Sequence, residues 1–209
     1  MLTVADHPSL VVAVFTTDFG RPLRDREARE AWLNFEHEIV PPGIERTEER
    51  RKGIRDMLRH GGYKPTGRGK PASEYLIKAV EAGKLGPINA AVDVCNVVSY
   101  FSGFPISVVD LASAKVPFEI AVAPEGASYA FNPSGQTIDL GGLLCLFDRY
   151  GPCGNAVKDS QRTKTNDETH KTLSVLWGCK GHERALDIAL AWYFGLLSDA
   201  GGQTNVLVR

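Results

Sequence analysis

The stretch INAAVDVCNVVSYFSGFPISVVD, residues 88–110, places polar side chains inside an otherwise apolar segment. If its first part is a helix, one face carries Asn89, Asp93, Asn96 and Tyr100. Another face carries Ile88, Val92, Cys95 and Val98 with Ser99. Burying an unpaired polar group costs about 1–3 kcal/mol. The polar stripe therefore predicts one of two roles: it orders a neighbouring loop through hydrogen bonds, or it lines a pocket.

Segments with helical and strand-like patterns flank this stretch without a regular β-α-β alternation. Apolar spacing predicts helices over residues 25–39, 47–60, 74–82, 167–179 and 182–199. Strands are predicted over residues 10–17, 116–123, 128–131, 136–140 and 143–147, with the NPSG sequence at 132–135 as a turn. This distribution favours an α+β class over a doubly wound sheet. We expect residues 1–209 to form a single domain, in which residues 1–70 are an N-terminal extension packed on the rest.

Composition limits the class of protein. Hydrophobic content of 43% and charged content of 23% are close to globular averages. The cysteines show neither C-x-x-C pairs nor a paired spacing with histidine: Cys95, Cys145, Cys153 and Cys179. We therefore expect no metal site, no disulfide framework and a reduced setting. The apolar runs are too short for a signal peptide or a bilayer span, so a soluble cytoplasmic protein without membrane partners is expected.

Positive charge is concentrated between residues 46 and 70. This region holds nine Lys/Arg against three Asp/Glu, whereas the formal net charge of the whole chain is −1. Arginines recur every four residues on the predicted helix 47–60, and a Gly/Pro-rich loop follows. The predicted RNA-binding residues are Arg51, Arg55, Arg59, Lys64, Arg68 and Lys70. The alternative is a solvated helix face that acidic neighbours balance.

The order I-N-x-x-V-D-x-x-N, followed by an apolar run, G-x-P and D-L, resembles the B3/B4 domain of the bacterial phenylalanyl-tRNA synthetase beta subunit. The residues that carry it are Ile88, Asn89, Val92, Asp93, Asn96, Gly103, Pro105, Asp110 and Leu111. The resemblance is closest to free-standing B3/B4-like proteins and extends, more weakly, over about residues 70–180. It implies a layered β-sandwich flanked by helices.

In the resembling family this domain hydrolyses the ester of a tRNA that carries the wrong amino acid. An aminoacyl ester is already activated, so hydrolysis needs a positioned water, a held ribose and a stabilised oxyanion. The resemblance therefore implies the aminoacylated 3′ end of tRNA as partner, no cofactor and no metal. It also implies an aminoacyl-tRNA deacylase, which is a carboxylic ester hydrolase.

Carrying the family's site onto this chain gives a mixed result. The family's T-N pair corresponds to Cys95-Asn96, while Ser107 stands where the family has its editing histidine. The family's editing glutamate has no counterpart at the end of residues 169–175. We expect Asn96 and Ser107, from the resemblance, and Asp159, from the segment at residues 156–172, to be the catalytic positions that orient water and ribose. Backbone N–H groups near Gly154 are predicted to hold the oxyanion.

The segment AVKDSQRTKTNDETHKT, residues 156–172, is a second candidate site beside the glycine-rich residues 151–154. Its dense donors and acceptors are suited to holding a phosphate or an α-amino group. A solvated loop is the alternative. The predicted substrate-binding residues are Asn89, Asp93, Cys95, Gly151, Gly154, Lys158, Ser160, Thr163, Lys164, Thr165 and Thr169.

Different function classes fit these patterns. The leading interpretation is a tRNA-binding protein that hydrolyses a mischarged aminoacyl-tRNA in trans, as a monomer or a homo-oligomer. The alternative is a non-catalytic module that binds tRNA or an amino acid and has a regulatory or recruiting role. A small-molecule hydrolase on the same scaffold is a third class. The missing histidine and glutamate keep the non-catalytic alternative open.

Overall fold

The computed structural model describes residues 2–25, 33, 35 and 40–209, so most of the helix predicted at 25–39 lies outside the described residues. The helices are α1 (Glu48–Arg59), α2 (Ala72–Glu81), α3 (Ala90–Ser102) and α4 (Glu183–Asp199). The first strands are β1 (Leu2–Val4), β2 (Leu10–Asp18), β3 (Ile106–Asp110), β4 (Phe118–Val122) and β5 (Ser128–Ala130). The others are β6 (Thr137–Asp139), β7 (Leu144–Asp148), β8 (Gly151–Asn155), β9 (Lys171–Cys179) and β10 (Gln203–Val208).

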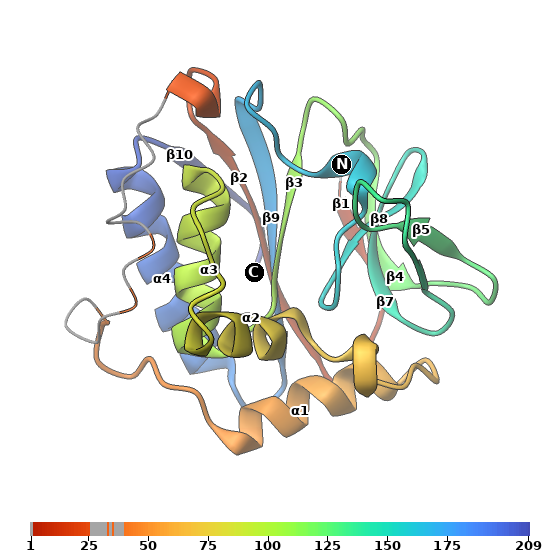
Figure 1. Cartoon of the computed structure of the whole chain (residues 1–209). Coiled ribbons are helices and arrows are strands. Elements are labelled where there is room, and N and C mark those ends of the chain that lie inside the picture. Colours follow the sequence, from red (N-terminus) through yellow and green to blue (C-terminus); the bar gives the residue numbers. More distant parts are fainter. Residues whose placement is uncertain (1, 26–32, 34, 36–39) are drawn as a thin grey trace.

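These strands form two four-stranded sheets and a hairpin. The first sheet has the order β10-β2-β9-β3 and is antiparallel; we call it the helix-covered sheet, because α3 and α4 lie on one side of it (Figure 1). The second, the outer sheet, has the order β1-β4-β7-β8. Strands β5 and β6 pair around the predicted NPSG turn, which ends at Gly135 with φ 76°. The α+β class is confirmed.

Strand β9 is buried on both faces. Its Ser174 lies opposite Phe15 of β2, and Phe15 packs edge-on against Tyr193 of α4, with 5.2 Å between ring centroids. The next residue in the strand, Val175, and Trp177 therefore point the other way, toward the outer sheet. The predicted helix at 167–179 is wrong. A central strand with two buried faces reads as a continuous apolar run, and periodicity alone does not separate that from a helix.

Residues 151–154, expected as a glycine-rich loop, form most of β8 instead. Strand β8 pairs with β7, with Gly154 opposite Leu146 and Gly151 opposite Asp148. The backbone near Gly154, whose N–H groups were expected to hold an oxyanion, takes part in this pairing of β8 with β7. The β8 edge instead meets β3 of the helix-covered sheet, which brings the two sheets together at the candidate site.

Helix α1 ends where two backbones touch. A Cβ atom added to Gly61, just beyond α1, would lie 2.3 Å from the carbonyl oxygen of Gly142. Conversely, a Cβ on Gly142, whose φ is 73°, would lie 2.2 Å from the carbonyl oxygen of Gly61. Glycine is required on both sides of this contact. It fixes the start of the loop at residues 61–70 against the segment between β6 and β7.

Candidate functional site

Two segments that carry the predicted binding residues line one pocket. From the loop at residues 61–70 come Tyr63, Lys64, Thr66, Arg68 and Gly69. From the β5–β6 hairpin and the segment after β8 come Phe131, Gln136, Thr137, Ile138, Asp139 and Lys158. Three cations therefore meet one carboxylate here, and we call this site the basic pocket. The predicted RNA-binding residue Lys70, at the end of this loop, does not line the pocket.

Two lysines contact Phe131: Lys158, which lines the basic pocket, and Lys164, which lies outside its lining. The Lys158 ammonium lies 4.0 Å from the centre of the Phe131 ring, and Lys164 Nζ donates to the Phe131 carbonyl oxygen over 2.6 Å. Burial and, second, the positive charge of Arg68 lower the pKa of Lys158. Cations held this close repel one another, so an anion between them is favoured electrostatically.

The arginine stripe on α1 is neutralised within the protein. Each arginine pairs with a carboxylate: Arg51 with Glu48, Arg55 with Glu74, and Arg59 with Asp56. The Arg55 pair is bidentate, with N–O distances of 2.6 and 2.5 Å, and its hydrogen bonds to Glu74 raise the pKa of Arg55. These ion pairs agree with the alternative of a balanced helix face, while RNA contact by the stripe stays a prediction. The basic pocket is therefore the stronger candidate for binding an anion.

Three predicted site residues meet where β3 approaches β8. The Asp159 carboxylate accepts hydrogen bonds from the backbone N–H of Asn155 (3.1 Å) and of Val108 (3.3 Å). A Cβ on Gly154 would lie 3.0 Å from Asp159 Oδ1 and 3.6 Å from Ser107 Oγ. Burial raises the pKa of Asp159 to about 6, against these hydrogen bonds and the neighbouring Ser107 hydroxyl, which act in the opposite direction. A carboxylate of this pKa is suited to proton transfer near neutral pH.

Ser107 joins the two sheets. Its side chain is fully buried, donates a hydrogen bond to the Asn155 carbonyl oxygen (3.0 Å) and accepts one from the Trp177 indole N–H (2.9 Å). Both functions of the hydroxyl are thus engaged within the protein. These contacts give Ser107 a positioning role, whereas the sequence analysis expected it to orient water.

Replacing Ser107 by alanine is expected to lower the free energy of unfolding by about 1–3 kcal/mol. The substitution leaves the Trp177 indole N–H and the Asn155 carbonyl oxygen buried without their partner, and each such loss carries a desolvation cost. Urea denaturation followed by tryptophan fluorescence measures the change. Ser134→Ala, in the exposed turn at 132–135, is the control and should stay within about 0.5 kcal/mol of the original protein.

The structure does not bring Asn96 to Ser107. Helices α3 and α4 cover the face of the helix-covered sheet that carries Phe15. Ser107 projects from the opposite face of this sheet, toward β8. Asn96 lies on a partly exposed side of α3 that it shares with Val92 and Tyr100. The expected shared water site of Asn96 and Ser107 is therefore not formed.

The polar stripe orders the N-terminus of α3. Asn89 is its N-cap, accepting a hydrogen bond from the Val92 N–H (3.1 Å). Its amide donates to Thr165 Oγ1 (3.1 Å), which ties the helix to the segment 156–172. The fully buried Asp93 accepts from the Ile88 N–H (2.9 Å), and burial raises its pKa. Here the first of the two predicted roles, ordering a loop, is the one observed.

The hydroxyl groups of the segment 156–172 stabilise its own turns. Thr163 Oγ1 donates to the Cys153 carbonyl oxygen (3.0 Å), Ser160 Oγ accepts from the Arg162 N–H (3.3 Å), and Thr169 Oγ1 accepts from the Asn166 N–H (2.9 Å). Thr163 and Thr169 are fully buried. Of this segment, Lys158, Asp159 and Lys164 remain as candidates for direct contact with a ligand.

Burial makes the Cys95 thiol a poor nucleophile. Cys95 is 6% exposed, and burial raises its pKa to about 12, so its reactive thiolate form is scarce at neutral pH. Among residues 2–25, 33, 35 and 40–209, no three His, Cys, Asp or Glu side chains are grouped to hold a metal ion. Within the same ranges, no helix has the length and apolar character needed to cross a bilayer.

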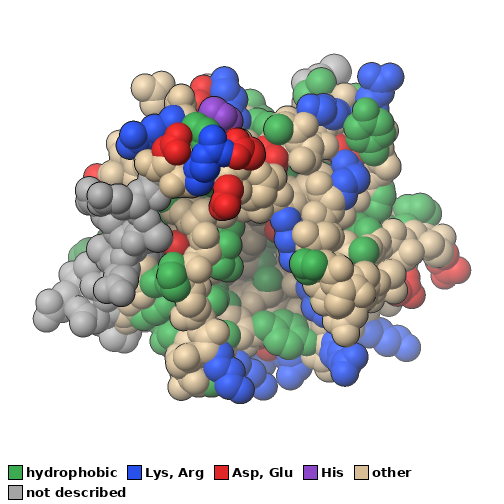
Figure 2. Space-filling view, turned by 45° about the horizontal axis from the view of Figure 1, so that its top comes forward, with side chains coloured by type: hydrophobic (Ala, Val, Ile, Leu, Met, Phe, Trp, Pro, Cys, Tyr) green, Lys and Arg blue, Asp and Glu red, His purple; other side chains and the backbone are tan. Residues whose placement is uncertain are grey.

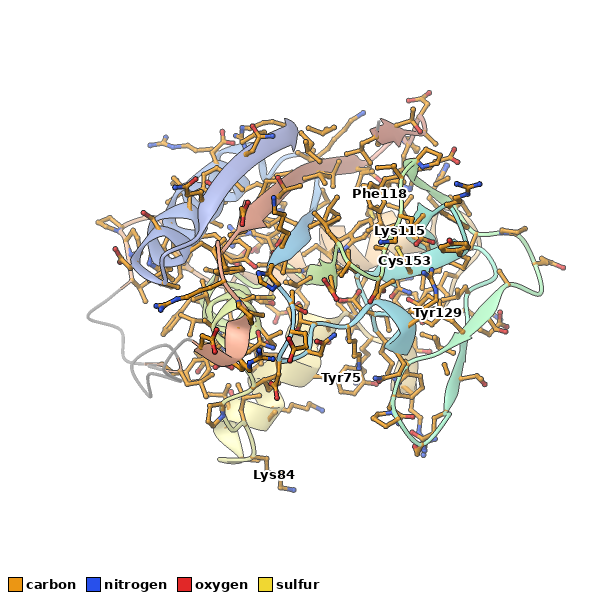
Figure 3. The ribbon with its side chains drawn as sticks, turned by 90° about the horizontal axis from the view of Figure 1, so that it is seen from above. Tyr75, Lys84, Lys115, Phe118, Tyr129 and Cys153 are labelled. Carbon is orange, nitrogen blue, oxygen red and sulfur yellow. The ribbon has the colours of Figure 1, made fainter. Side chains whose placement is uncertain are left out.

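Tyr129 is a site residue that the sequence analysis missed. Its hydroxyl donates to the Lys158 carbonyl oxygen (2.5 Å) and accepts from the Asn155 side-chain amide. Figure 3 shows Tyr129 near Cys153 on the outer-sheet side of the molecule. Tyr129 thus connects the basic pocket to the cluster around Asp159. A lone tyrosine in a three-residue strand carries no sequence signal for this role.

One face of the molecule is concave. Figure 2 shows a deep hollow between the helical side of the molecule and the side that holds the outer sheet. Basic side chains follow the wall on the outer-sheet side. This shape allows a ligand to reach from the surface toward the junction of the two sheets.

Comparison with known proteins bears on the fold. No protein-family model matches the chain, and no curated protein matches it. The structure is similar to an N-terminal fragment of the phenylalanyl-tRNA synthetase beta-subunit from Pyrococcus horikoshii. The TM-score is 0.50 at 12% sequence identity, over 98% of this chain and 50% of that fragment. The chain thus spans half of the fragment's length, and the likeness concerns the fold alone. The similarity to a synthetase beta subunit is confirmed at that level, while its assignment to the B3/B4 domain stays a prediction.

Proposed function

We propose that this chain binds the aminoacylated end of a tRNA and hydrolyses a mischarged ester in trans, as a B3/B4-like domain over residues 1–209. The observation that carries the proposal is the convergence of Lys64, Arg68 and Lys158 in one pocket. Each of these cations can neutralise the negative charge of a backbone phosphate, and Phe131 offers an aromatic face beside them. The fold similarity to a fragment of a phenylalanyl-tRNA synthetase subunit supports a tRNA as the RNA.

The hydrolytic step is assigned to the cluster around Asp159. Asp159 follows Lys158 directly, and Tyr129 bonds the Lys158 carbonyl oxygen and the Asn155 amide, so an RNA end in the basic pocket would place its terminal ester near the carboxylate. In the proposed step, Asp159 takes a proton from a water as the water oxygen attacks the ester carbon. The ribose oxygen leaves and takes that proton from Asp159, which returns to its carboxylate form. The reaction releases a free amino acid and an uncharged tRNA.

The salt dependence of RNA binding tests the first half of the proposal. Replacing Lys64, Arg68 and Lys158 together by alanine is expected to reduce the slope of log K against log salt by about 2 units, because each single-strand phosphate contact contributes about 0.7. The measurement is fluorescence anisotropy with a labelled tRNA over a salt series.

A matched triple variant controls for the loss of net charge. Replacing Arg51, Arg55 and Arg59 by alanine removes the same formal charge from α1, where each arginine already pairs with a carboxylate. Its slope is expected to stay within about 0.5 units of the original. Equal flattening by both variants would show a diffuse electrostatic effect and contradict binding in the basic pocket. Thermal melts establish that both variants are folded.

The second candidate function is a non-catalytic tRNA-binding module. The engagement of the Ser107 hydroxyl in two hydrogen bonds favours it, because the position of the family's editing histidine then holds a structural group. A panel of correctly and incorrectly charged tRNAs separates the two functions. Binding without deacylation above background across the panel would support the module and contradict the hydrolase.

A further inference from the structure

A second pocket lies between α1 and α2 and shares no lining residue with the basic pocket. We call it the α1–α2 pocket. Its volume is about 220 Å³, below the ~300–1,000 Å³ typical of sites for drug-sized ligands. The lining residues that matter for its chemistry are Arg46, Arg50, Ile54, Pro71, Ile77 and Glu81. A small ligand with both charged and apolar parts matches this set.

Arg50 supplies a buried positive charge. Only 5% of this residue is exposed, and its Nη1 donates to the carbonyl oxygens of Glu45 (2.5 Å) and Ser102 (2.6 Å). Its Nε is buried without a hydrogen-bond partner. Within the described part of the chain, no carboxylate oxygen forms an ion pair with Arg50. The Arg50 guanidinium also lies 4.7 Å from the centre of the Phe104 ring. Its carbonyl and ring contacts supply no negative charge, so the buried cation favours an external carboxylate.

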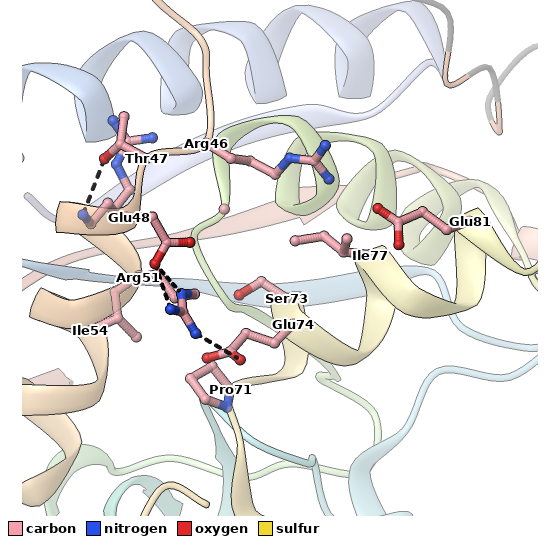
Figure 4. A pocket seen from close by; sticks show the side chains of 12 residues that line it. Arg46, Thr47, Glu48, Arg51, Ile54, Pro71, Ser73, Glu74, Ile77 and Glu81 are labelled. Carbon is pink, nitrogen blue, oxygen red and sulfur yellow. Dashed lines mark hydrogen bonds and ion pairs between the residues drawn. The ribbon is translucent and has the colours of Figure 1, made fainter.

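Arg46 and Glu81 add one charge of each sign. The Arg46 guanidinium lies 4.3 Å from the centre of the Tyr100 ring, and neither Arg46 nor Glu81 is in an ion pair with another described residue. Figure 4 shows both side chains beside Ile77, away from the dashed contacts that join Arg51 to Glu48 and Glu74. The pocket therefore has a free cation and a free carboxylate next to neighbours that are already paired.

The wall between these charges is apolar. Ile54 of α1 is 1% exposed, and Pro71 and Ile77 line the facing side. Apolar side chains that meet across a pocket favour a ligand whose body is also apolar. A purely anionic ligand such as phosphate would leave this wall and Glu81 without a partner.

We propose that the α1–α2 pocket binds a small zwitterion, namely a free amino acid with an apolar side chain. Its carboxylate contacts Arg46 and Arg50, its ammonium contacts Glu81, and its side chain lies on Ile54 and Ile77. This inference does not rest on the proposed function, because it concerns a different pocket.

Isothermal titration with L-leucine tests the site, with N-acetyl-L-leucine and L-leucinamide as ligands that lack one charge each. Glu81→Gln is expected to weaken leucine binding about 2- to 5-fold, the scale of one partly exposed ion pair. It should leave the affinity for N-acetyl-leucine unchanged, because that ligand has no ammonium. Arg46→Gln should weaken leucine binding to a similar degree and leave the affinity for leucinamide unchanged, because that ligand has no carboxylate. Glu125→Gln, an exposed carboxylate outside the pocket, is the control and should change nothing.

Ile77→Trp fills the pocket from a partly exposed position and is expected to weaken leucine binding about 10-fold or more. The same variant should leave the slope of log K against log salt for tRNA binding unchanged, which separates this site from the basic pocket. Absence of leucine binding up to its solubility limit overturns the proposal. So does leucine binding that Ile77→Trp leaves intact, or N-acetyl-leucine binding as tight as that of leucine.

Discussion

Replacing Asp159 by asparagine is expected to slow deacylation of a mischarged tRNA about 10- to 1,000-fold, the scale of losing one preorganised contact worth about 1.4–4 kcal/mol. Asparagine keeps the size of the side chain but does not accept a proton from water. Single-turnover deacylation with purified protein measures the change. Glu125→Gln, an exposed carboxylate outside the basic pocket, is the matched control and should alter the rate less than about 3-fold.

The pH profile adds a second test of the same role. Because burial raises the pKa of Asp159 to about 6, its basic form declines as the pH falls below 6. The rate should therefore drop about 10-fold for each pH unit below that value, whereas a carboxylate of ordinary pKa would keep it flat to about pH 4. A flat profile between pH 5 and 7, on a protein that deacylates, would remove Asp159 from the mechanism.

The same raised pKa links stability to pH. Between about pH 4 and 6 the folded state holds a proton on Asp159 that the unfolded state has lost, so the free energy of unfolding falls as the pH rises through this window. Asp159→Asn removes this contribution. Urea denaturation at several pH values should show a shallower decline for the variant, which also confirms that it is folded.

Replacing Gly142 by alanine is expected to destabilise the protein by about 3–5 kcal/mol. The added Cβ would lie 2.2 Å from the Gly61 carbonyl oxygen, so the two backbones must separate, and a φ of 73° is unfavourable for alanine as well. Chemical denaturation measures the loss. Because Gly61 begins the loop at residues 61–70, the variant should also bind tRNA more weakly at temperatures where it is folded.

Gly126→Ala isolates the close approach from the backbone conformation. Gly126 has a similar φ of 79°, but a Cβ there meets nothing within 4 Å. Gly126→Ala should lower the free energy of unfolding by only about 1–2 kcal/mol, the strain of alanine in the left-handed conformation. Equal losses for the two variants would mean that the contact between Gly61 and Gly142 adds nothing to stability.

Local sequence patterns predicted the elements that local interactions determine. The NPSG turn forms between two short strands, and a helix forms within residues 88–110, as predicted. The Asn89 cap and the Gly103 end of this helix, where φ is 75°, were not predicted. Helix α1 also follows its pattern, with Thr47 accepting a hydrogen bond from the Arg50 N–H. Caps and turns act over three or four residues, so one sequence is enough to find them.

Elements that depend on distant partners were not predictable in the same way. Strand β9 is a strand because β2 and β3 flank it, and β8 because β7 pairs with it. Whether Arg55 is free to bind a phosphate depends on its ion pair with Glu74, which lies on another helix. The sequence identified the cations of the basic pocket, but only the fold brings residues 61–70 to Lys158. Likewise, only the formed helix-covered sheet places Ser107 on one of its faces and α3 on the other.

The position of β2 has a consequence for the order in which the chain folds. Strand β2, at residues 10–18, is hydrogen-bonded on one side to β9 and on the other to β10, so both of its partners come from the last forty residues of the chain. A nascent chain emerging from the ribosome therefore carries an apolar strand with two unpaired edges until residues 171–208 have been synthesised. Such long-range pairing slows folding and exposes the strand to aggregation in the meantime. The helix-covered sheet assembles only after translation has delivered its C-terminal strands.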